Sequence, residues 1–129
     1  MILLDTQTML WMAEDIPRIG QLTWRKIEAE QLAVSAISFW EMAMLVEKKR
    51  LLASHTPEEL RRIVLSTQAF EVPVTGEIGI RAAQLEGFHG DPADRLIVAT
   101  ALHHGATLMT SDKKILAWQG SLKSWDVRK

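Results

Sequence analysis

One stretch, from Asp91 to Asp112, constrains the fold of this chain more than any other. It reads DPADRLIVATALHHGATLMTSD and opens with two carboxylates beside a proline. The pattern predicts a helix that stops at Gly105, then the short strand TLMT, and then a third carboxylate at Asp112. Ligand sites in open α/β sheets lie beyond the carboxyl ends of the strands, where helix N-termini also point. Acids at the start of a helix and at the end of the next strand can therefore meet in one cleft.

The rest of the chain repeats this alternation of short apolar runs and helical segments. An almost wholly apolar helix is predicted from about Ser38 to Lys49, which must be buried against the protein, a partner or both. The predicted strands are Ile2 to Leu4, Leu32 to Val34, an edge strand from Glu71 to Val74, and a last strand from Lys123 to Val127. This alternation predicts an α/β fold with a parallel sheet covered on both faces, and the length predicts one domain over residues 1–129.

Composition excludes several classes of protein. The absence of cysteine excludes a disulfide framework and a cysteine nucleophile, and it suits the reducing cytoplasm. The longest uncharged run, Leu96 to Ser111, has 16 residues, whereas a membrane span needs about 20 apolar residues. The N-terminus also lacks the basic region of a signal peptide. We therefore expect a soluble cytoplasmic protein with no membrane association.

The net charge of −1 argues against a generic basic nucleic-acid binder. Setting aside the four proposed site acids named below leaves 12 acidic against 15 basic residues, a balance of +3. A bound divalent cation would offset the charge of the acids themselves. A modest basic rim around such a site can still attract phosphates.

Two more acids follow the rule set by the Asp91 to Asp112 stretch. Asp5 closes the strand ILL, and Glu41 lies early in the helix after the strand LAV. We predict that Asp5, Glu41, Asp94 and Asp112 form one acidic, metal-binding pocket. Two carboxylates about 4 Å apart repel by roughly 4 kcal/mol at an effective dielectric constant of 20, so four of them require protons or a cation. An all-oxygen donor set favours Mg²⁺ or Mn²⁺ over zinc.

Each acid also has a purely structural interpretation, which stays open at this stage. Asp5 can cap the helix that follows it, and Asp112 can cap a short helix from Lys113. Glu41 can complete a capping box that begins at Ser38. Only the combination of the acids favours a site.

The acids Asp91 and Asp94 are assigned different roles. With Pro92 at the first helical position, Asp91 falls at the N-cap and is predicted to be structural, whereas Asp94 projects from the first turn and can serve a metal. Supporting hydroxyls stand beside the site acids at Thr6, Thr110 and Ser111, where they can orient carboxylates or waters or form local backbone bonds.

The remaining candidates are predicted to be structural. Arg95 can pair with a nearby acid or contact a phosphate, but it is predicted to be solvated at the surface. The histidines lack the spacing of metal ligands and are assigned surface or capping roles: His55, His89, His103 and His104. The tryptophans are assigned to the core, although an exposed one can stack on a base or anchor a partner: Trp11, Trp24, Trp40, Trp118 and Trp125.

With these residues in place, the chain resembles a PIN domain and, within that group, a VapC-type toxin of bacterial toxin–antitoxin pairs. Four segments match in order and span nearly the whole chain: LLDTQTMLW, VSAISFWEMAML, HGDPADRLIVATAL and TLMTSD. One departure is that Leu45 and Val46 stand where relatives often carry a basic residue. The family's four acids fall on Asp5, Glu41, Asp94 and Asp112, and its leading aspartate falls on Asp91.

The resemblance implies a five-stranded parallel sheet of order 3-2-1-4-5 in a three-layer α/β/α sandwich, and usually a homodimer. It also implies a Mg²⁺-dependent endoribonuclease that cuts RNA to 5′-phosphate and 3′-hydroxyl ends, together with a small antitoxin whose C-terminal segment blocks the acidic cleft. Two alternatives remain, a receiver-like phosphorylation switch and an inactive PIN-like scaffold that only binds RNA or protein. A receiver would want adjacent acids after the first strand and a lysine after a late one, which this sequence lacks.

Overall fold

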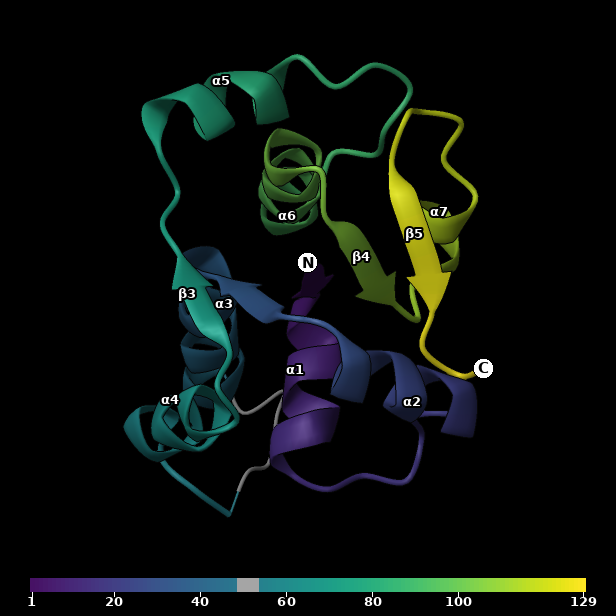
Figure 1. The fold of residues 1–129 in the computed structure, drawn as a ribbon. Coiled ribbons are helices and arrows are strands. Elements are labelled where there is room, and N and C mark those ends of the chain that lie inside the picture. Colours follow the sequence, from purple (N-terminus) through teal and green to yellow (C-terminus); the bar gives the residue numbers. More distant parts are fainter. Residues whose placement is uncertain (49–53) are drawn as a thin grey trace.

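The computed structural model describes residues 1–48 and 54–129, and the predicted helix end at Lys49 lies outside them. Strands and helices alternate along the chain (Figure 1). Their order is β1 (Ile2–Leu4), α1 (Thr6–Ala13), α2 (Gln21–Ala29), β2 (Leu32–Ser35), α3 (Ala36–Glu47), α4 (Pro57–Ser66), β3 (Phe70–Val72), α5 (Gly76–Ala83), α6 (Pro92–His104), β4 (Thr107–Thr110), α7 (Lys113–Leu116) and β5 (Lys123–Asp126).

The five strands form one sheet of order β3-β2-β1-β4-β5, and every neighbouring pair is parallel. Both the predicted sheet and its order are confirmed. Leu4 at the end of β1 pairs with Val34 on one side and Met109 on the other, so the carboxyl ends of the three central strands align. Receiver domains have the order 2-1-3-4-5, and this difference excludes the receiver-like alternative.

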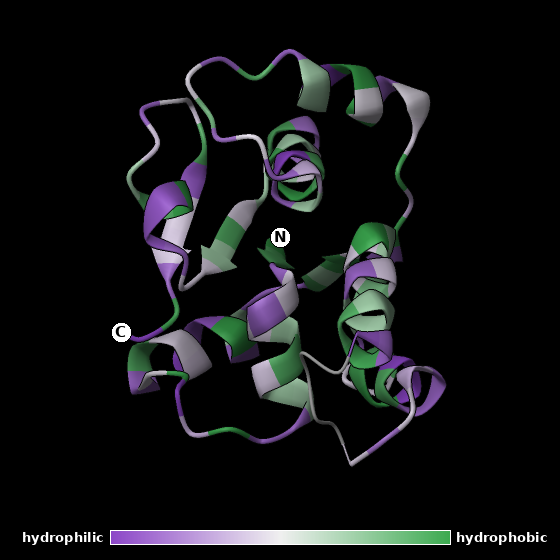
Figure 2. Ribbon diagram, turned by 180° about the vertical axis from the view of Figure 1, so that it is seen from behind, coloured by the Kyte–Doolittle hydropathy of each residue, from purple (hydrophilic) through white to green (hydrophobic). Residues whose placement is uncertain are grey.

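The sheet separates two hydrophobic layers, because successive strand residues point to opposite faces. Leu4, Val34 and Met109 pack with residues of α1, α2 and α4, whereas Leu3 and Leu108 pack with α6 and α7 on the other face. In Figure 1, α5 and α6 lie on one side of the sheet and α1, α2 and α4 on the other. Figure 2 shows green, hydrophobic strands between these layers.

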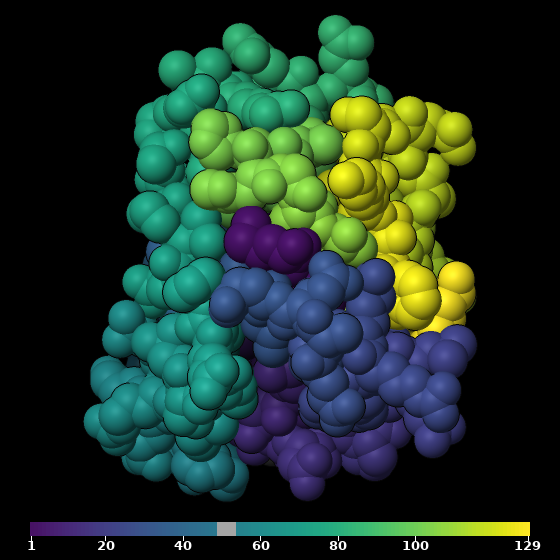
Figure 3. Space-filling model, in the orientation of Figure 1, coloured from purple at the N-terminus to yellow at the C-terminus, as the bar shows by residue number. Residues whose placement is uncertain are grey.

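The amino end of β1 lies between two other segments of the chain. Ile2 N donates to Gln31 O at 2.8 Å, and Thr107 N donates to Met1 O at 3.0 Å. The space-filling view shows the purple N-terminus enclosed by the blue and green segments that carry these partners (Figure 3). At the opposite, carboxyl edge of the sheet the chain leaves β1 after Leu4 and β4 after Thr110. From β1 it continues to the neighbouring strand β2 on one side, and from β4 to β5 on the other. This is the topological switch point at which α/β sheets place their ligand sites.

The prediction of a capping box from Ser38 to Glu41 is wrong. The helix α3 begins at Ala36, because Ser35 at the end of β2 is its N-cap and accepts a hydrogen bond from Ile37 N at 3.2 Å. Strand and helix thus join without a loop. Ser38 is a buried residue of the first turn, and Glu41 lies on the second turn, free of any capping role.

The helix α6 has the predicted ends. Asp91 Oδ1 accepts from Asp94 N at 2.9 Å, and Pro92 occupies the first helical position. Gly105 ends the helix with φ of +61°, a left-handed conformation that glycine adopts at little cost. Asp94 is therefore held on the first turn at the carboxyl edge of the sheet.

The apolar helix α3 is only partly buried. Met42 is fully buried, but Trp40 is 54% exposed. Of the two ways predicted to bury this helix, the protein itself covers only one part of it, and the exposed part around Trp40 is free for a partner. Within residues 1–48 and 54–129, no helix has the length and apolar character needed to cross a bilayer.

Candidate metal centre

Asp5 is fixed at the carboxyl end of β1 by the start of α1. Its Oδ1 accepts from Thr8 N at 2.8 Å, so the structural capping role predicted for Asp5 is present. Its Oδ2 accepts a hydrogen bond from the hydroxyl of Thr110. The carboxylate is nevertheless buried, and both of its hydrogen-bond partners among the described residues are neutral. Capping and a site role are thus compatible in this residue.

Thr110 at the end of β4 links two of the predicted acids. Its hydroxyl donates to Asp5 and accepts from Asp112 N at 2.9 Å. Asp112 in turn caps α7, because its Oδ1 accepts from Lys114 N at 2.8 Å and from Ile115 N at 3.2 Å. The supporting role predicted for Thr110 is therefore structural and concerns the spacing of Asp5 and Asp112.

Glu41 reaches the same edge of the sheet from α3. Thr6, at the start of α1, donates from its hydroxyl to Ser38 Oγ at 3.0 Å, and this buried bond ties α1 to the turn before Glu41. It sets the position of α3 relative to Asp5. The Thr6 side chain also hydrogen-bonds the Glu41 carboxylate, and this bond opposes the rise that burial causes in the Glu41 pKa.

The four predicted acids line one pocket of about 240 Å³. Thr6, Ser111 and Leu45 also line it. Asp94 and Asp112 border a second, more open cavity of about 490 Å³ as well, which Asp91 lines together with Lys113 and Lys114. The structure therefore brings together carboxylates that lie up to 107 residues apart in the chain.

The carboxylates are crowded enough to change each other's ionisation. Burial raises the pKa of Asp94 to about 7, and the charges of Asp91, Asp112, Glu41 and Asp5 add to that rise. Burial likewise raises the pKa of Asp5, although its hydrogen bonds partly offset the effect. Burial also raises the pKa of Glu41. The pocket therefore carries negative charge that the described residues do not compensate.

This donor set fits a hard divalent cation. Carboxylate oxygens are the protein ligands that suit Mg²⁺ and Mn²⁺. The raised pKa values of Asp5, Glu41 and Asp94 show that each would be stabilised in its charged form by a nearby positive ion. Asp5 and Asp94 would contribute oxygens from β1 and α6, while Glu41 and Asp112 would complete the set from α3 and the end of β4.

His89 was assigned a surface or capping role, but it borders this site. Its Nε2 is buried, makes no hydrogen bond within the described residues, and lies 3.3 Å from Asp94 Oδ2. One possible ligand atom from each of His89, Asp94 and Asp112 lies within 4.8 Å of the others. The signal that could have found it is its position two residues before Asp91, the cap of α6, because the start of α6 brings this turn to the pocket.

The hydrogen bond on the other ring nitrogen indicates what His89 does there. Asp91 N donates to His89 Nδ1 at 3.4 Å. In a neutral imidazole the accepting nitrogen has no proton, so Nε2 carries it. A metal at Nε2 would require the opposite tautomer and would set two N–H groups against each other. With its proton on Nε2, His89 can pair with Asp94 at 3.3 Å, and it cannot offer the same nitrogen to a metal.

The prediction that Arg95 is solvated at the surface is wrong. Its guanidinium donates to five backbone carbonyls, at distances from 2.9 to 3.3 Å. The acceptors are Ala82, Ala83, Leu85, Phe88 and His89. Arg95 thus anchors the end of α5 and the loop before α6, and it fixes the backbone of His89.

Comparisons with known proteins agree with this geometry. A model of the PIN domain matches residues 2–118. The chain is 38% identical over 117 residues to Ribonuclease VapC22 of Mycobacterium tuberculosis (strain ATCC 25618 / H37Rv), covering 88% of each protein. VapBC-1 from nontypeable Haemophilus influenzae is similar along the full length of both chains, with a TM-score of 0.73 and 19% identity. A toxin–antitoxin complex from Klebsiella pneumoniae has a TM-score of 0.68 and 24% identity, covering 98% of this chain and 97% of that one.

Proposed function

The chain belongs to the PIN-domain family, and we propose that it is a Mg²⁺-dependent endoribonuclease that acts as the toxin of a toxin–antitoxin pair. The observation that carries this proposal is the convergence of Asp5, Glu41, Asp94 and Asp112 on one pocket at the switch point of the sheet. The identity of 38% to a ribonuclease of M. tuberculosis supports the activity. A cytoplasmic location follows from an RNA substrate.

In the proposed mechanism the protein supplies a rigid set of oxygens. Bound Mg²⁺ would supply Lewis acidity for activating water and for stabilising charge on the scissile phosphate. Asp5 is held by Thr8 N–H and the Thr110 hydroxyl before any ligand arrives, so little rearrangement is needed. Asp5 and Asp94 are proposed as direct metal ligands, with Glu41 and Asp112 binding a second ion or acting through water. Mn²⁺ would substitute for Mg²⁺ because it accepts the same oxygens.

The surroundings of the pocket suit a strand of RNA. Lys113 and Lys114 border the cavity that adjoins Asp94 and Asp112, where they can contact phosphates on either side of the cleaved bond. His89 lines the same cavity, and its Nε2–H, which lies 3.3 Å from Asp94 Oδ2, is proposed to turn to a phosphate oxygen or to the leaving oxygen when RNA binds. In-line displacement by water is proposed to leave a 5′-phosphate and a 3′-hydroxyl, as the family resemblance implies.

The proposed partners are a small antitoxin and a second copy of the chain. Proteins of similar fold include toxin–antitoxin complexes, such as VapBC from Salmonella typhimurium bound to DNA. The exposed indole of Trp40 on α3 lies next to Glu41 in sequence and would bury apolar surface in such an assembly. An antitoxin segment on this side of the molecule would lie close enough to the acidic pocket to block it.

Removal of divalent metal is expected to abolish cleavage of RNA. Purified protein is incubated with a mixed pool of single-stranded RNA in millimolar Mg²⁺ or in EDTA, and the products are mapped by ligation that requires a 5′-phosphate. We expect a loss in EDTA of roughly 100-fold or more, because several kcal/mol of the barrier reduction depends on the metal, and restoration by Mn²⁺.

Protein with Asp5→Asn, purified in the same way, controls for contaminating ribonuclease. Equal cleavage in EDTA, or by Asp5→Asn, would remove the proposed mechanism. An absence of cleavage by wild type in both metals, with metal binding intact, would favour the inactive scaffold instead.

A further inference from the structure

A larger cavity adjoins the acidic site and has no role in the mechanism above. It has a volume of about 910 Å³ and lies between the loop after α5 and the turns after α7. Its lining includes two aromatic side chains, Phe88 and Trp118, and two cations, Arg81 and Lys114. His89 and Lys114 line both this cavity and the one that borders Asp94 and Asp112. A continuous surface therefore leads from the acidic pocket to the aromatic cavity.

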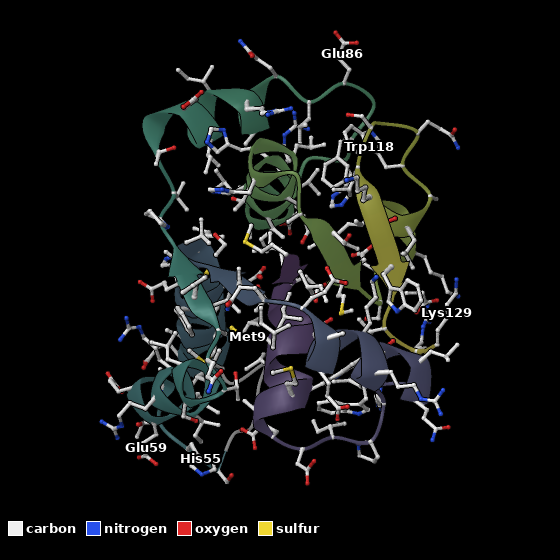
Figure 4. All side chains as sticks on the ribbon, in the orientation of Figure 1. Met9, His55, Glu59, Glu86, Trp118 and Lys129 are labelled. Carbon is white, nitrogen blue, oxygen red and sulfur yellow. The ribbon has the colours of Figure 1, made fainter. Side chains whose placement is uncertain are left out.

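The aromatic rings are held in place by several contacts. Trp118 Nε1 donates to Glu86 O at 3.0 Å, and the ring centroids of Phe88 and Trp118 are 5.5 Å apart in an edge-to-face arrangement. Figure 4 shows Trp118 between α6 and β5, below the loop that carries Glu86. Gly120 packs directly on the six-membered ring of Trp118, where a Cβ would lie 2.2–2.4 Å from ring carbons. The indole is therefore positioned before any ligand arrives.

We propose that this aromatic cavity receives the base of the RNA nucleotide next to the scissile phosphate. The inference rests on the proposed nuclease function and adds where the substrate strand lies. Aromatic side chains beside a nucleic-acid strand bind bases by stacking, whatever the base, because every base has a π-face. A strand whose phosphate lies at Asp94 and Asp112 would continue past His89 and Lys114 into this cavity.

The charges of the cavity suit a nucleotide better than an apolar peptide. Arg81, in the last turn of α5, and Lys114 outnumber the carboxylate of Glu86 in the lining, and they provide two cations for the phosphate that joins the stacked nucleotide to the next. Gln119 and Ser121 line the same cavity and offer hydrogen-bonding groups to the edge of the base. Stacking by Trp118 would therefore give affinity, and these polar side chains would give a preference among bases.

The test uses the indole N–H of Trp118 as a site-specific probe. Protein labelled with ¹⁵N is kept in EDTA and titrated with short single-stranded RNA oligonucleotides of mixed sequence, so that nothing is cleaved. The Trp118 indole resonance is assigned from its loss in Trp118→Phe. We expect this resonance to move on titration while that of Trp24 on α2, which lies outside the cavity, stays unchanged.

Substitutions test the same cavity through the affinity for RNA. Trp118→Leu is expected to weaken binding about 10-fold and Trp118→Phe much less, because stacking survives on a phenyl ring. Arg81→Gln with Lys114→Gln is expected to reduce the dependence of binding on salt, and these two exposed positions do not threaten folding. Trp24→Leu is the matched control, with unchanged affinity.

The outcomes distinguish this inference from the nuclease proposal. Cleavage of RNA in Mg²⁺ with a stationary Trp118 resonance and an unchanged KM in Trp118→Leu would overturn the base site and leave the nuclease intact. A moving resonance without cleavage in any metal would support the base site and overturn the nuclease. A stationary Trp118 resonance together with an absence of cleavage would overturn both the base site and the nuclease. An equal movement with inorganic polyphosphate would reduce the cavity to an anion site and so overturn base stacking.

Discussion

Asp94→Asn is expected to slow RNA cleavage by roughly three orders of magnitude, the equivalent of about 4 kcal/mol in the activation barrier. The amide keeps the size of the side chain and leaves the backbone bond from Asp94 N to Asp91 untouched. What it removes is the negative charge that would hold the metal. The loss of activity therefore reports on the cation and not on the fold of α6.

The same substitution is expected to make the metal-free protein more stable. The pKa of Asp94 is raised to about 7 in the folded state from a usual value of 3.8. The protonated Asp94 carboxyl therefore contributes to the free energy of unfolding, and this contribution is fully present below about pH 4. It is lost as pH rises through about 7, because the folded state must give up a proton that it binds more tightly than the unfolded state does. At about pH 8 the charged carboxylate costs on the order of 2 to 4 kcal/mol, which the neutral amide avoids.

Urea denaturation in EDTA measures this effect. We expect Asp94→Asn to exceed wild type in the free energy of unfolding at about pH 8, and the difference to shrink towards zero near pH 4. Glu77→Gln, at an exposed position on α5, removes the same charge elsewhere and controls for the net charge. A variant less stable than wild type at both pH values would show that Asp94 is paired within the protein, and the metal site would lose its main support.

Arg95→Lys is expected to destabilise the protein by about 2 to 4 kcal/mol, although it preserves the charge. The planar guanidinium reaches five carbonyls at the end of α5 and in the following loop, whereas an ammonium group can donate only three hydrogen bonds. The carbonyls that the lysine cannot reach would then have no hydrogen-bond donor although they are partly buried, and this costs free energy of folding. Cleavage is expected to fall about 10- to 100-fold at the same time, because the loop positions His89 beside the metal site.

Chemical denaturation and cleavage rates at a temperature well below the unfolding midpoint separate the two effects. The conservative control is Arg62→Lys at an exposed position of α4. A loss of stability no larger for Arg95→Lys than for Arg62→Lys would contradict the anchoring role. Destabilisation without any change in cleavage would show that the loop does not contribute to the site.

Much of the fold was predictable because it depends on local patterns. The apolar triplet before Asp5, the proline after Asp91 and Gly105 each mark an element boundary by a short-range physical rule, and the structure has those boundaries. Convergence of the acids followed from topology, since parallel strands end at a common edge. The start of α3 was missed because Ser35 and Ser38 are both acceptable caps, and only the register of β2 against β1 decides between them.

The contribution of Arg95 was not predictable from sequence, and that of His89 was signalled only by its position two residues before the cap of α6. Neither residue belongs to a periodic pattern, and their partners are backbone atoms of a loop whose path the sequence does not define. Arg95 finds its acceptors because the loop turns its carbonyls inward, and His89 reaches Asp94 because the same loop returns to the start of α6. Contacts that depend on the path of a loop become visible only when the backbone is known.

Calorimetric titration of Mg²⁺ and Mn²⁺ into protein freed of metal by EDTA and dialysis tests most directly whether the four carboxylates form a cation site. We expect wild type to bind both ions in the millimolar range or tighter, Asp5→Asn and Asp94→Asn to bind them at least about 10-fold more weakly, and Glu77→Gln to bind like wild type. Absence of binding at millimolar concentration, or equal binding by all four proteins, would contradict the metal centre and with it the proposed nuclease.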